Sequence, residues 1–327
     1  MIPAKLKPGD GVRVIAPSQS MNLPWITQEA LEIALQRFKE LGLKVSFGKH
    51  VHEMNEFNSS SIDSRIEDLH DAFKDKNVKL IITIMGGFNS CELLPYLDYN
   101  LIKANPKILC GYSDITALQN AIYAKTGLVT YSGPHYFNFG EKKNFEHTQE
   151  YFKKCFFSKE AFELKPSEKW SRDHWSNDQD KRNFEKNNGY FIINSGEAEG
   201  TIIGANMVTF HALSGTQYMP AFKDTVLFIE EDDEETLYSF NRNLTSLTLR
   251  NDFSKVKGIV MGRLHPDSKI GYNELRLIVN NNERLKKIPI IGGVDFGHTT
   301  PMITFPIGGK AKFSAYNNKV ELEIIEH

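Results

Sequence analysis

The sequence predicts an α/β protein, with an N-terminal parallel-sheet sandwich domain followed by a smaller, β-rich mixed α/β domain. Strand-like and helix-like segments alternate along the N-terminal half, and some of the strand-like runs are apolar enough for burial on both faces. At 327 residues the chain also exceeds the length at which one hydrophobic core usually stops growing. We therefore expect an N-terminal domain over residues 1–165, a connecting loop over 166–190 and a C-terminal domain over 191–327.

The N-terminal half shows the alternation most clearly. Residues 12–16 form a short β-rich run, and residues 27–41 carry apolar side chains at helical spacing until Gly42 ends the helix. Such alternation favours parallel strands joined by right-handed crossovers. We predict strands at 12–16, 44–47, 80–84, 108–110 and 128–131, and helices at 27–41, 60–73, 113–122 and 144–157.

The C-terminal half combines buried strand-like runs with fewer helices. Residues 225–229 are wholly apolar apart from Thr225, and Leu237, Phe240 and Leu244 follow at helical spacing. Residues 289–301 have the composition of a glycine-rich turn. We predict strands at 198–203, 225–229, 256–261, 310–314 and 319–325, and helices at 207–213 and 237–247.

Charge and cysteine content exclude several classes of function. The formal net charge is −2 and there is no basic block, so bulk electrostatics favours neither nucleic acid nor an anionic membrane surface. No run of about 18 apolar residues occurs, and the N-terminus has no signal-peptide pattern. Three widely spaced cysteines fit neither a disulfide framework nor a zinc site. We expect a cytoplasmic protein that needs no metal and no cofactor.

A glycine pair, Gly86-Gly87, follows the predicted strand 80–84. Glycines at the carboxyl end of a parallel strand let the backbone approach a ligand closely, but a tight turn with positive φ explains them equally well. The chain has no G-x-G-x-x-G sequence and no Walker lysine here, so the pair does not indicate a dinucleotide or nucleoside triphosphate.

Ser113 follows the buried run 108–110, where Gly111-Tyr112 separates that strand from the next helix. A serine on such a turn projects from the sheet edge, and backbone N–H groups at the helix N-terminus can stabilise an oxyanion. This is the arrangement of a nucleophile elbow. The alternative is that Ser113 and Asp114 only cap the helix, since both residue types are favoured at that position.

Two other residues follow β-runs and could complete a hydrolytic site. Glu230 directly follows the apolar run 225–229 and begins a series of six acids that would otherwise be a solvated loop. Among ten histidines, His298 alone lies in a Gly-His-Thr-Thr-Pro turn, although a loop histidine is more often a surface residue. Hydrolysis by an activated hydroxyl needs a base and a group that orients it, and Glu230 and His298 have those chemical types.

The polar connection carries two of the three tryptophans, Trp170 and Trp175. A polar connection of this length is usually functional or disordered, and tryptophans argue against disorder. The two indoles either seal the junction between the domains or stack on a ligand. The residues alone leave both interpretations open.

The chain resembles the LD-carboxypeptidase family of serine peptidases, and within it the branch of microcin C self-immunity peptidases. The likeness runs nearly end to end, and its Gly-Tyr-Ser-Asp-x-Thr-Ala-Leu segment is distinctive. Ile115 replaces the second glycine of the common G-x-S-x-G elbow, as in this family, and Ala205 replaces a glycine found in many relatives. The resemblance rests on residues 86–90, 94–98, 111–118, 200–206, 227–230 and 297–299.

The resemblance implies a role for each matching residue. Ser113 is the expected nucleophile, His298 the general base and Glu230 the residue that orients it. The backbone N–H groups of Gly87 and Asp114 are the expected oxyanion hole. The expected substrate contacts are Gly86, Phe88, Asn206, and Trp175 in preference to Trp170.

The two branches of the family differ in substrate. The self-immunity branch cleaves the amide that joins a peptidyl or aminoacyl group to a modified nucleotide, and the other branch removes a terminal D-amino acid from murein tetrapeptide. The Asn89-Ser90 continuation of the glycine loop and the tryptophan-bearing connection resemble the first branch. We therefore expect a small peptide or peptidyl-nucleotide substrate, with murein peptide as the alternative. A non-catalytic protein that binds such ligands is a third possibility, and relatives suggest a homodimer.

Overall fold

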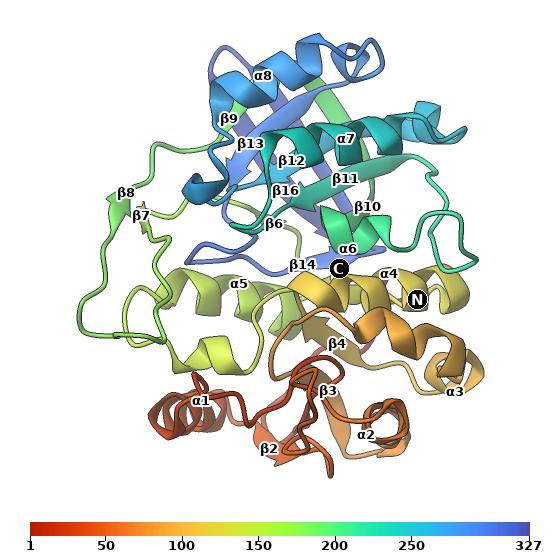
Figure 1. Cartoon of the computed structure of the whole chain (residues 1–327), viewed down its shortest axis with the longest axis vertical. Coiled ribbons are helices and arrows are strands. Elements are labelled where there is room, and N and C mark those ends of the chain that lie inside the picture. The colour runs from red at the N-terminus through yellow and green to blue at the C-terminus, as the bar shows by residue number, and fades with distance from the viewer.

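The computed structural model describes residues 1–327 as two large sheets with helices on their faces and one small two-stranded sheet (Figure 1). The first sheet has the strand order β14-β5-β4-β3-β1-β2, and its five N-terminal strands pair in parallel, as predicted. Only β14 is antiparallel to its neighbour. The strands are β1 (Gly11–Ile15), β2 (Lys44–Phe47), β3 (Val78–Thr83), β4 (Ile108–Gly111), β5 (Thr130–Ser132) and β14 (Phe305–Ile307).

Two of the helices in the N-terminal half, α1 and α2, begin at capping residues that the sequence offers. The side chains of Thr27 and Ser61 accept hydrogen bonds from backbone N–H groups in the first turns of α1 and α2. Helix α3 was not expected from the sequence, because six residues are too few to show a helical period. The helices are α1 (Gln28–Glu40), α2 (Ile62–Lys74), α3 (Tyr99–Ala104), α4 (Thr116–Thr126) and α5 (Glu146–Phe157).

The second sheet has eight strands in the order β6-β16-β15-β10-β11-β12-β13-β9. Its central strands β10 to β13 are parallel, and antiparallel strands flank them on both sides. The strands are β6 (Phe162–Glu163), β9 (Phe191–Asn194), β10 (Gly196–Asn206), β11 (Thr225–Glu230), β12 (Val256–Gly262), β13 (Ile290–Val294), β15 (Lys310–Tyr316) and β16 (Lys319–Glu326). The helices of this half are α6 (Met207–His211), α7 (Leu237–Thr248) and α8 (Tyr272–Asn280).

Several C-terminal elements differ from the sequence-based expectation. Strand β10 continues through Asn206, although Gly204-Ala205 suggested that it ends earlier. The predicted turn 289–301 begins with strand β13, whose two glycines concealed a fully buried strand. Neither α8 nor the edge strand β9 was expected, because the surrounding segments are polar.

Two strands cross the predicted division between the domains. Strand β6 precedes residue 165 but pairs with β16 in the second sheet, whereas β14 comes from the C-terminal half and extends the first sheet. The buried apolar residues form two clusters, and each contains residues of both sheets. Figure 1 shows α4 where the two halves meet. The halves therefore share their cores, and the exact domain limits stay a prediction.

The carboxyl ends of four parallel strands face the junction of the two sheets, and the site is built there. Strand β3 leads to the glycine pair, β4 to Ser113, β11 to Glu230 and β13 to His298. The three cysteines form no disulfide bond. None of the helices has the length and apolar character required to cross a membrane.

Candidate active site

Ser113 occupies a strained turn between β4 and α4. Its φ is +59°, a left-handed value that non-glycine residues seldom adopt and that clusters at functional sites. Gly86 makes room for the turn, because a Cβ on Gly86 would lie 3.0 Å from the Cβ of Ser113. The Ser113 side chain caps no helix, which removes the alternative interpretation of this residue. The carboxylate of Asp114 instead accepts hydrogen bonds from Ser18 Oγ (2.6 Å) and from the Ser90 N–H (2.8 Å).

Ser113, His298 and Glu230 form one chain of hydrogen bonds. The Nε2 atom of His298 lies 3.0 Å from Ser113 Oγ, and its Nδ1 atom lies 2.9 Å from Glu230 Oε2. Glu230 is buried at the end of β11 and cannot turn toward solvent. Gly297 precedes the histidine with φ +111°, and a Cβ there would lie 2.7 Å from Glu230 Oε2. A glycine is therefore required for the turn to approach the carboxylate.

The environment of His298 determines the pKa of its imidazole. Burial lowers the pKa of His298, but the charge and hydrogen bond of Glu230, together with the charges of Asp232 and Asp233, raise it above its ordinary value of 6.5. With Nδ1–H donating to Glu230, the neutral ring presents the lone pair of Nε2 to the Ser113 hydroxyl. Proton transfer from Ser113 to His298 is therefore geometrically and electrostatically feasible.

Two backbone N–H groups flank Ser113. Those of Gly87 and Asp114 donate no hydrogen bond within the chain. Gly87 has φ +147°, and a Cβ on it would lie 2.7 Å from Cγ of Gln19 and even closer to Ser18 Oγ. Glycine is therefore needed for its conformation and for space. The two free donors are suited to an oxyanion formed on a carbonyl carbon attached to Ser113.

Ser113 and His298 line a cavity of about 220 Å³. Phe88, whose side chain is exposed, lines it together with Asp232 and Asp233. No lysine or arginine lines this cavity, so its charged wall is acidic. Gly86, Gly87 and Phe88, which the sequence predicted as site residues, line this cavity, and their roles stay predictions. No role was predicted for the acidic residues that follow Glu230.

Sequence reasoning missed a second histidine in this cavity. His135 is buried, and its Nδ1 atom lies 2.6 Å from Thr83 Oγ1 while its Nε2 atom has no hydrogen-bond partner. Burial and the neighbouring charge of His298 lower the pKa of His135 to about 3, so its ring stays neutral. The Tyr112 ring lies between the two histidines, 4.3 Å from His135 and 5.3 Å from His298. The sequence feature that could have identified His135 is its position just after the strand-like run that forms β5.

A second cavity of about 220 Å³ adjoins the first at His298 and Tyr112. Trp175 and Trp25 line it together with Phe137, whose ring centroid is 4.7 Å from that of Trp175. Trp175 thus packs on the N-terminal half and also faces a cavity beside the histidine. The sequence pointed to Trp175 and gave no indication for Trp25.

Two predicted contact residues lie outside both cavities. The Trp170 ring lies 4.7 Å from the guanidinium of Arg263, and the two line a separate cavity. Asn206 caps α6 by accepting from the Thr209 N–H (3.0 Å), and its Nδ2 atom lies 3.4 Å from Glu231. These contacts belong to the fold, and a role in substrate binding stays a prediction for either residue.

Glu231 directly follows Glu230 and is also buried. Burial and then the adjacent charge of Glu230 raise the pKa of Glu231 to about 10. The Glu231 carboxyl is therefore neutral at physiological pH. No group of three or more His, Cys, Asp or Glu side chains is arranged to hold a metal ion.

Comparison with protein families identifies the family of the chain. Residues 12–133 match the LD-carboxypeptidase N-terminal domain, and residues 199–313 match the LD-carboxypeptidase C-terminal domain. The chain belongs to the LD-carboxypeptidase family. This membership confirms the resemblance seen in the sequence and makes the protein a serine carboxypeptidase.

Known proteins of the family align with the whole chain. "Putative carboxypeptidase YocD" of Bacillus subtilis strain 168 is 47% identical over 327 residues, which is 100% of both chains. The murein tetrapeptide carboxypeptidase of Pseudomonas aeruginosa is 25% identical, over 93% of this chain and 94% of that protein.

Solved structures of the family share the fold. An MccF-like protein from Bacillus anthracis superimposes with a TM-score of 0.98 at 50% identity, covering 100% of both chains. The Microcin C7 self-immunity protein MccF, known from Escherichia coli, has been solved in complex with aspartyl sulfamoyl adenosine. That structure has a TM-score of 0.89 at 31% identity and covers 100% of this chain and 99% of its own. The predicted α/β fold with a second, β-rich part is thereby confirmed.

Proposed function

We propose that this carboxypeptidase hydrolyses an amide bond with Ser113 as nucleophile, His298 as general base and Glu230 as the residue that orients the base. The observation that carries the proposal is the chain of two hydrogen bonds, 3.0 Å and 2.9 Å long, from Ser113 through His298 to Glu230. The three residues come from three strand ends far apart in the sequence. A protein that only bound a ligand would need no such alignment.

The proposed reaction has two steps. Ser113 Oγ attacks the scissile carbonyl carbon while its proton moves to Nε2 of His298, and Glu230 stabilises the resulting imidazolium. The N–H groups of Gly87 and Asp114 donate to the oxyanion, and each such donor is typically worth 10²–10³ in rate. The C–N bond then breaks as His298 protonates the leaving nitrogen. Water, deprotonated by His298, hydrolyses the acyl-enzyme and regenerates Ser113.

As substrate we propose a conjugate in which an aminoacyl or peptidyl group is joined to a nucleotide. Two observations support it: MccF has been solved with aspartyl sulfamoyl adenosine, and Trp175, Trp25 and Phe137 give the adjoining cavity aromatic walls. Stacking of a base on an aromatic side chain contributes roughly 1–3 kcal/mol. Murein tetrapeptide, the substrate named for a relative with 25% identity, is the alternative. A homodimer and a cytoplasmic location stay predictions.

One experiment tests the enzyme and the substrate together. Purified protein is incubated with aspartyl sulfamoyl adenosine or with murein tetrapeptide, and release of the free amino acid is followed by mass spectrometry. We expect turnover of the nucleotide conjugate and none with Ser113→Ala. Equal release by the wild type and Ser113→Ala would refute the catalytic assignment. Turnover of the tetrapeptide alone would refute the substrate.

A further inference from the structure

The connection between the two halves has almost no regular structure. Its only strands are the two-residue strands β7 (Lys169–Trp170) and β8 (Glu185–Lys186), which pair with each other, and a single β-bridge joins Ser171 to Thr300. In Figure 1 it runs along one side of the molecule, beside both halves. Side-chain contacts therefore have to hold the segment that carries Trp175.

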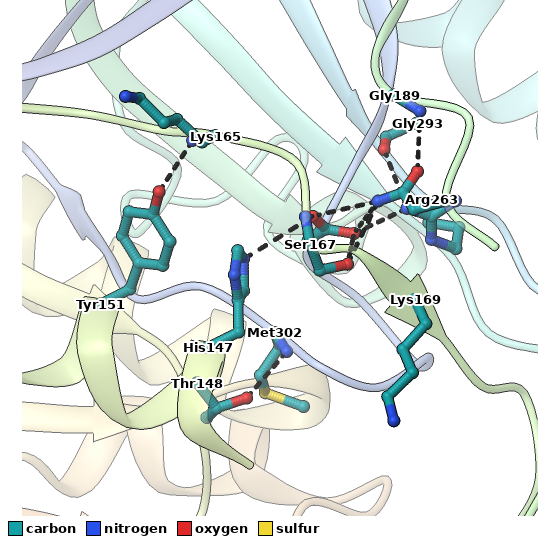
Figure 2. A network of polar contacts seen from close by, with 12 residues as sticks. His147, Thr148, Tyr151, Lys165, Ser167, Lys169, Gly189, Arg263, Gly293 and Met302 are labelled. Carbon is teal, nitrogen blue, oxygen red and sulfur yellow. Dashed lines mark hydrogen bonds and ion pairs between the residues drawn. The ribbon is translucent and has the colours of Figure 1, made fainter. Parts of the chain in front are cut away.

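One set of contacts is centred on Asp295, which lies just before the His298 turn. Its buried carboxylate accepts hydrogen bonds from the Ser167 N–H (2.7 Å), from Asn187 Nδ2 (3.2 Å) and from Arg263 Nη2 (2.6 Å). Figure 2 shows Ser167 and Arg263 converging in this network. Ser167 and Asn187 are the two ends of the connection, so both ends are anchored beside the strand that leads to His298.

A second set of contacts is centred on Arg182. It reaches the His298 turn at Thr300, which follows the histidine, whereas Asp295 precedes it. The guanidinium donates to Glu141 Oε1 (2.5 Å), to Asp173 Oδ1 (2.6 Å) and to Thr300 Oγ1 (2.9 Å). Only 1% of the Arg182 side chain is exposed. These acceptors belong to the N-terminal half, the connection itself and the histidine turn.

Backbone contacts reinforce the link to the histidine turn. The Ser171 N–H donates to the Thr300 carbonyl (2.7 Å), and the Thr300 N–H donates to the Ser171 carbonyl (2.9 Å). Asp173 and Arg182 close the intervening segment into a loop, and Trp175 lies within that loop. A displacement of Arg182 would therefore move both Trp175 and the turn that carries His298.

Arginine is the side chain suited to this position. Its planar fork reaches three acceptors at fixed angles, which a lysine ammonium on a flexible stem cannot reproduce. Burial raises the pKa of Glu141 to about 7, although the charge of Arg182 opposes the shift. Without Arg182, the Glu141 carboxyl would be left buried without its cation.

We propose that Arg182 is a positioning residue that fixes the Trp175 loop and the His298 turn in their working places together. Arg182 contacts neither Ser113 nor the two cavities beside it. It acts on His298 through Thr300, and on Trp175 through Asp173. This inference rests on the proposed function, since it assigns a role relative to that reaction.

The first test compares Arg182→Gln with Lys186→Gln. Lys186 is an exposed residue of the same connection, and its substitution removes the same charge. For aspartyl sulfamoyl adenosine, we expect Arg182→Gln to lower kcat and to raise KM, together reducing kcat/KM by roughly 100-fold, the size expected for a small misplacement of catalytic groups. Lys186→Gln should stay within twofold of the wild type. A folded Arg182→Gln protein with wild-type kcat and KM would overturn the proposal.

Thr300→Val provides a second test if Arg182→Gln does not fold. This change removes the contact from Arg182 to the histidine turn and the hydrogen bond of Thr300 to Glu141. It keeps the contacts of Arg182 itself to Glu141 and Asp173. We expect kcat to fall several-fold with KM unchanged, and Thr300→Ser to restore kcat. Unchanged kcat in Thr300→Val, or an equal loss in Thr300→Ser, would contradict the proposed link to His298.

Hydrogen exchange separates failure of this inference from failure of the proposed function, because it needs no substrate. In Arg182→Lys we expect faster exchange over residues 171–183 and 296–300 and unchanged exchange in the strands of the first sheet. Unchanged exchange in both segments would overturn the positioning role even if the wild type were an active peptidase. Absence of turnover by the wild type would refute the proposed function instead.

Discussion

The turns at the strand ends and the connection contribute to the same site by different physical means. Ser113, Glu230 and His298 each follow a strand whose backbone is held by a sheet, and their side chains meet at hydrogen-bond distance. The connection has no comparable backbone support, and buried side chains such as Arg182 and Asp295 hold it. The comparison separates residues that act in the chemical step from residues that position the site, whose loss should change kcat, KM or both through the placement of other groups.

The largest effect should come from the strand-end turns. We expect His298→Ala to lower kcat by about 10⁴-fold or more, similar to Ser113→Ala, because residues of a catalytic triad act as a unit. Steady-state kinetics of both single variants and the double variant measure this. The double variant should lose little more than either single variant, and additive losses would show that the two residues act independently.

Glu230→Gln should cost less, by roughly 10²–10³-fold, and should also move the pH profile. His298 must be neutral to accept a proton, so activity falls as the pH drops through its raised pKa. Removing the Glu230 charge lowers that pKa, and the acid limb of kcat/KM should move to lower pH. A pH–rate profile of wild type and variant measures the shift. Movement to higher pH would contradict the role given to Glu230.

The glycine pair offers a smaller perturbation of the same region. Gly87→Ala should lower kcat by about 10²-fold, because the added Cβ would collide with Ser18 Oγ and displace one oxyanion donor. Gly127→Ala is the matched control, since Gly127 also has a positive φ (+72°) but no neighbour within 4 Å. The control should lose stability and keep kcat. Equal kcat losses in both variants would point to backbone strain in place of oxyanion binding.

The smallest effect on kcat should come from Trp175 in the connection. Trp175→Ala should raise KM for a nucleotide conjugate by roughly 5- to 150-fold, corresponding to a loss of about 1–3 kcal/mol of stacking, and leave kcat nearly unchanged. The Trp170 ring packs on Arg263, so Trp170→Ala should lower thermal stability and leave KM unaffected. If Trp175→Ala weakened nucleotide and murein peptide substrates equally, Trp175 would serve packing on Phe137 instead.

Much of the fold was predictable from local patterns. The parallel strands of the first sheet and their helices follow from apolar periodicity and from caps such as Thr27 and Ser61, which act over a few residues. Helix α8 and strand β13 were not recognised, because a polar helix face and two strand glycines resemble a loop when tertiary packing is unknown. The exchange of β6 and β14 between the halves depends on pairings that no local pattern records.

The sequence by itself placed Ser113 and Glu230 just after buried strand-like runs and His298 in a glycine-rich turn. Its resemblance to the family then predicted that the three residues belong to one site. Only the tertiary structure decided that His135 joins them, that Trp175 faces the neighbouring cavity while Trp170 does not, and that Arg182 links the connection to the histidine turn. The physical reason is the distance along the chain over which each feature is specified. A strand end is specified by its own neighbours along the chain, whereas a buried contact between distant segments exists only after the chain has folded.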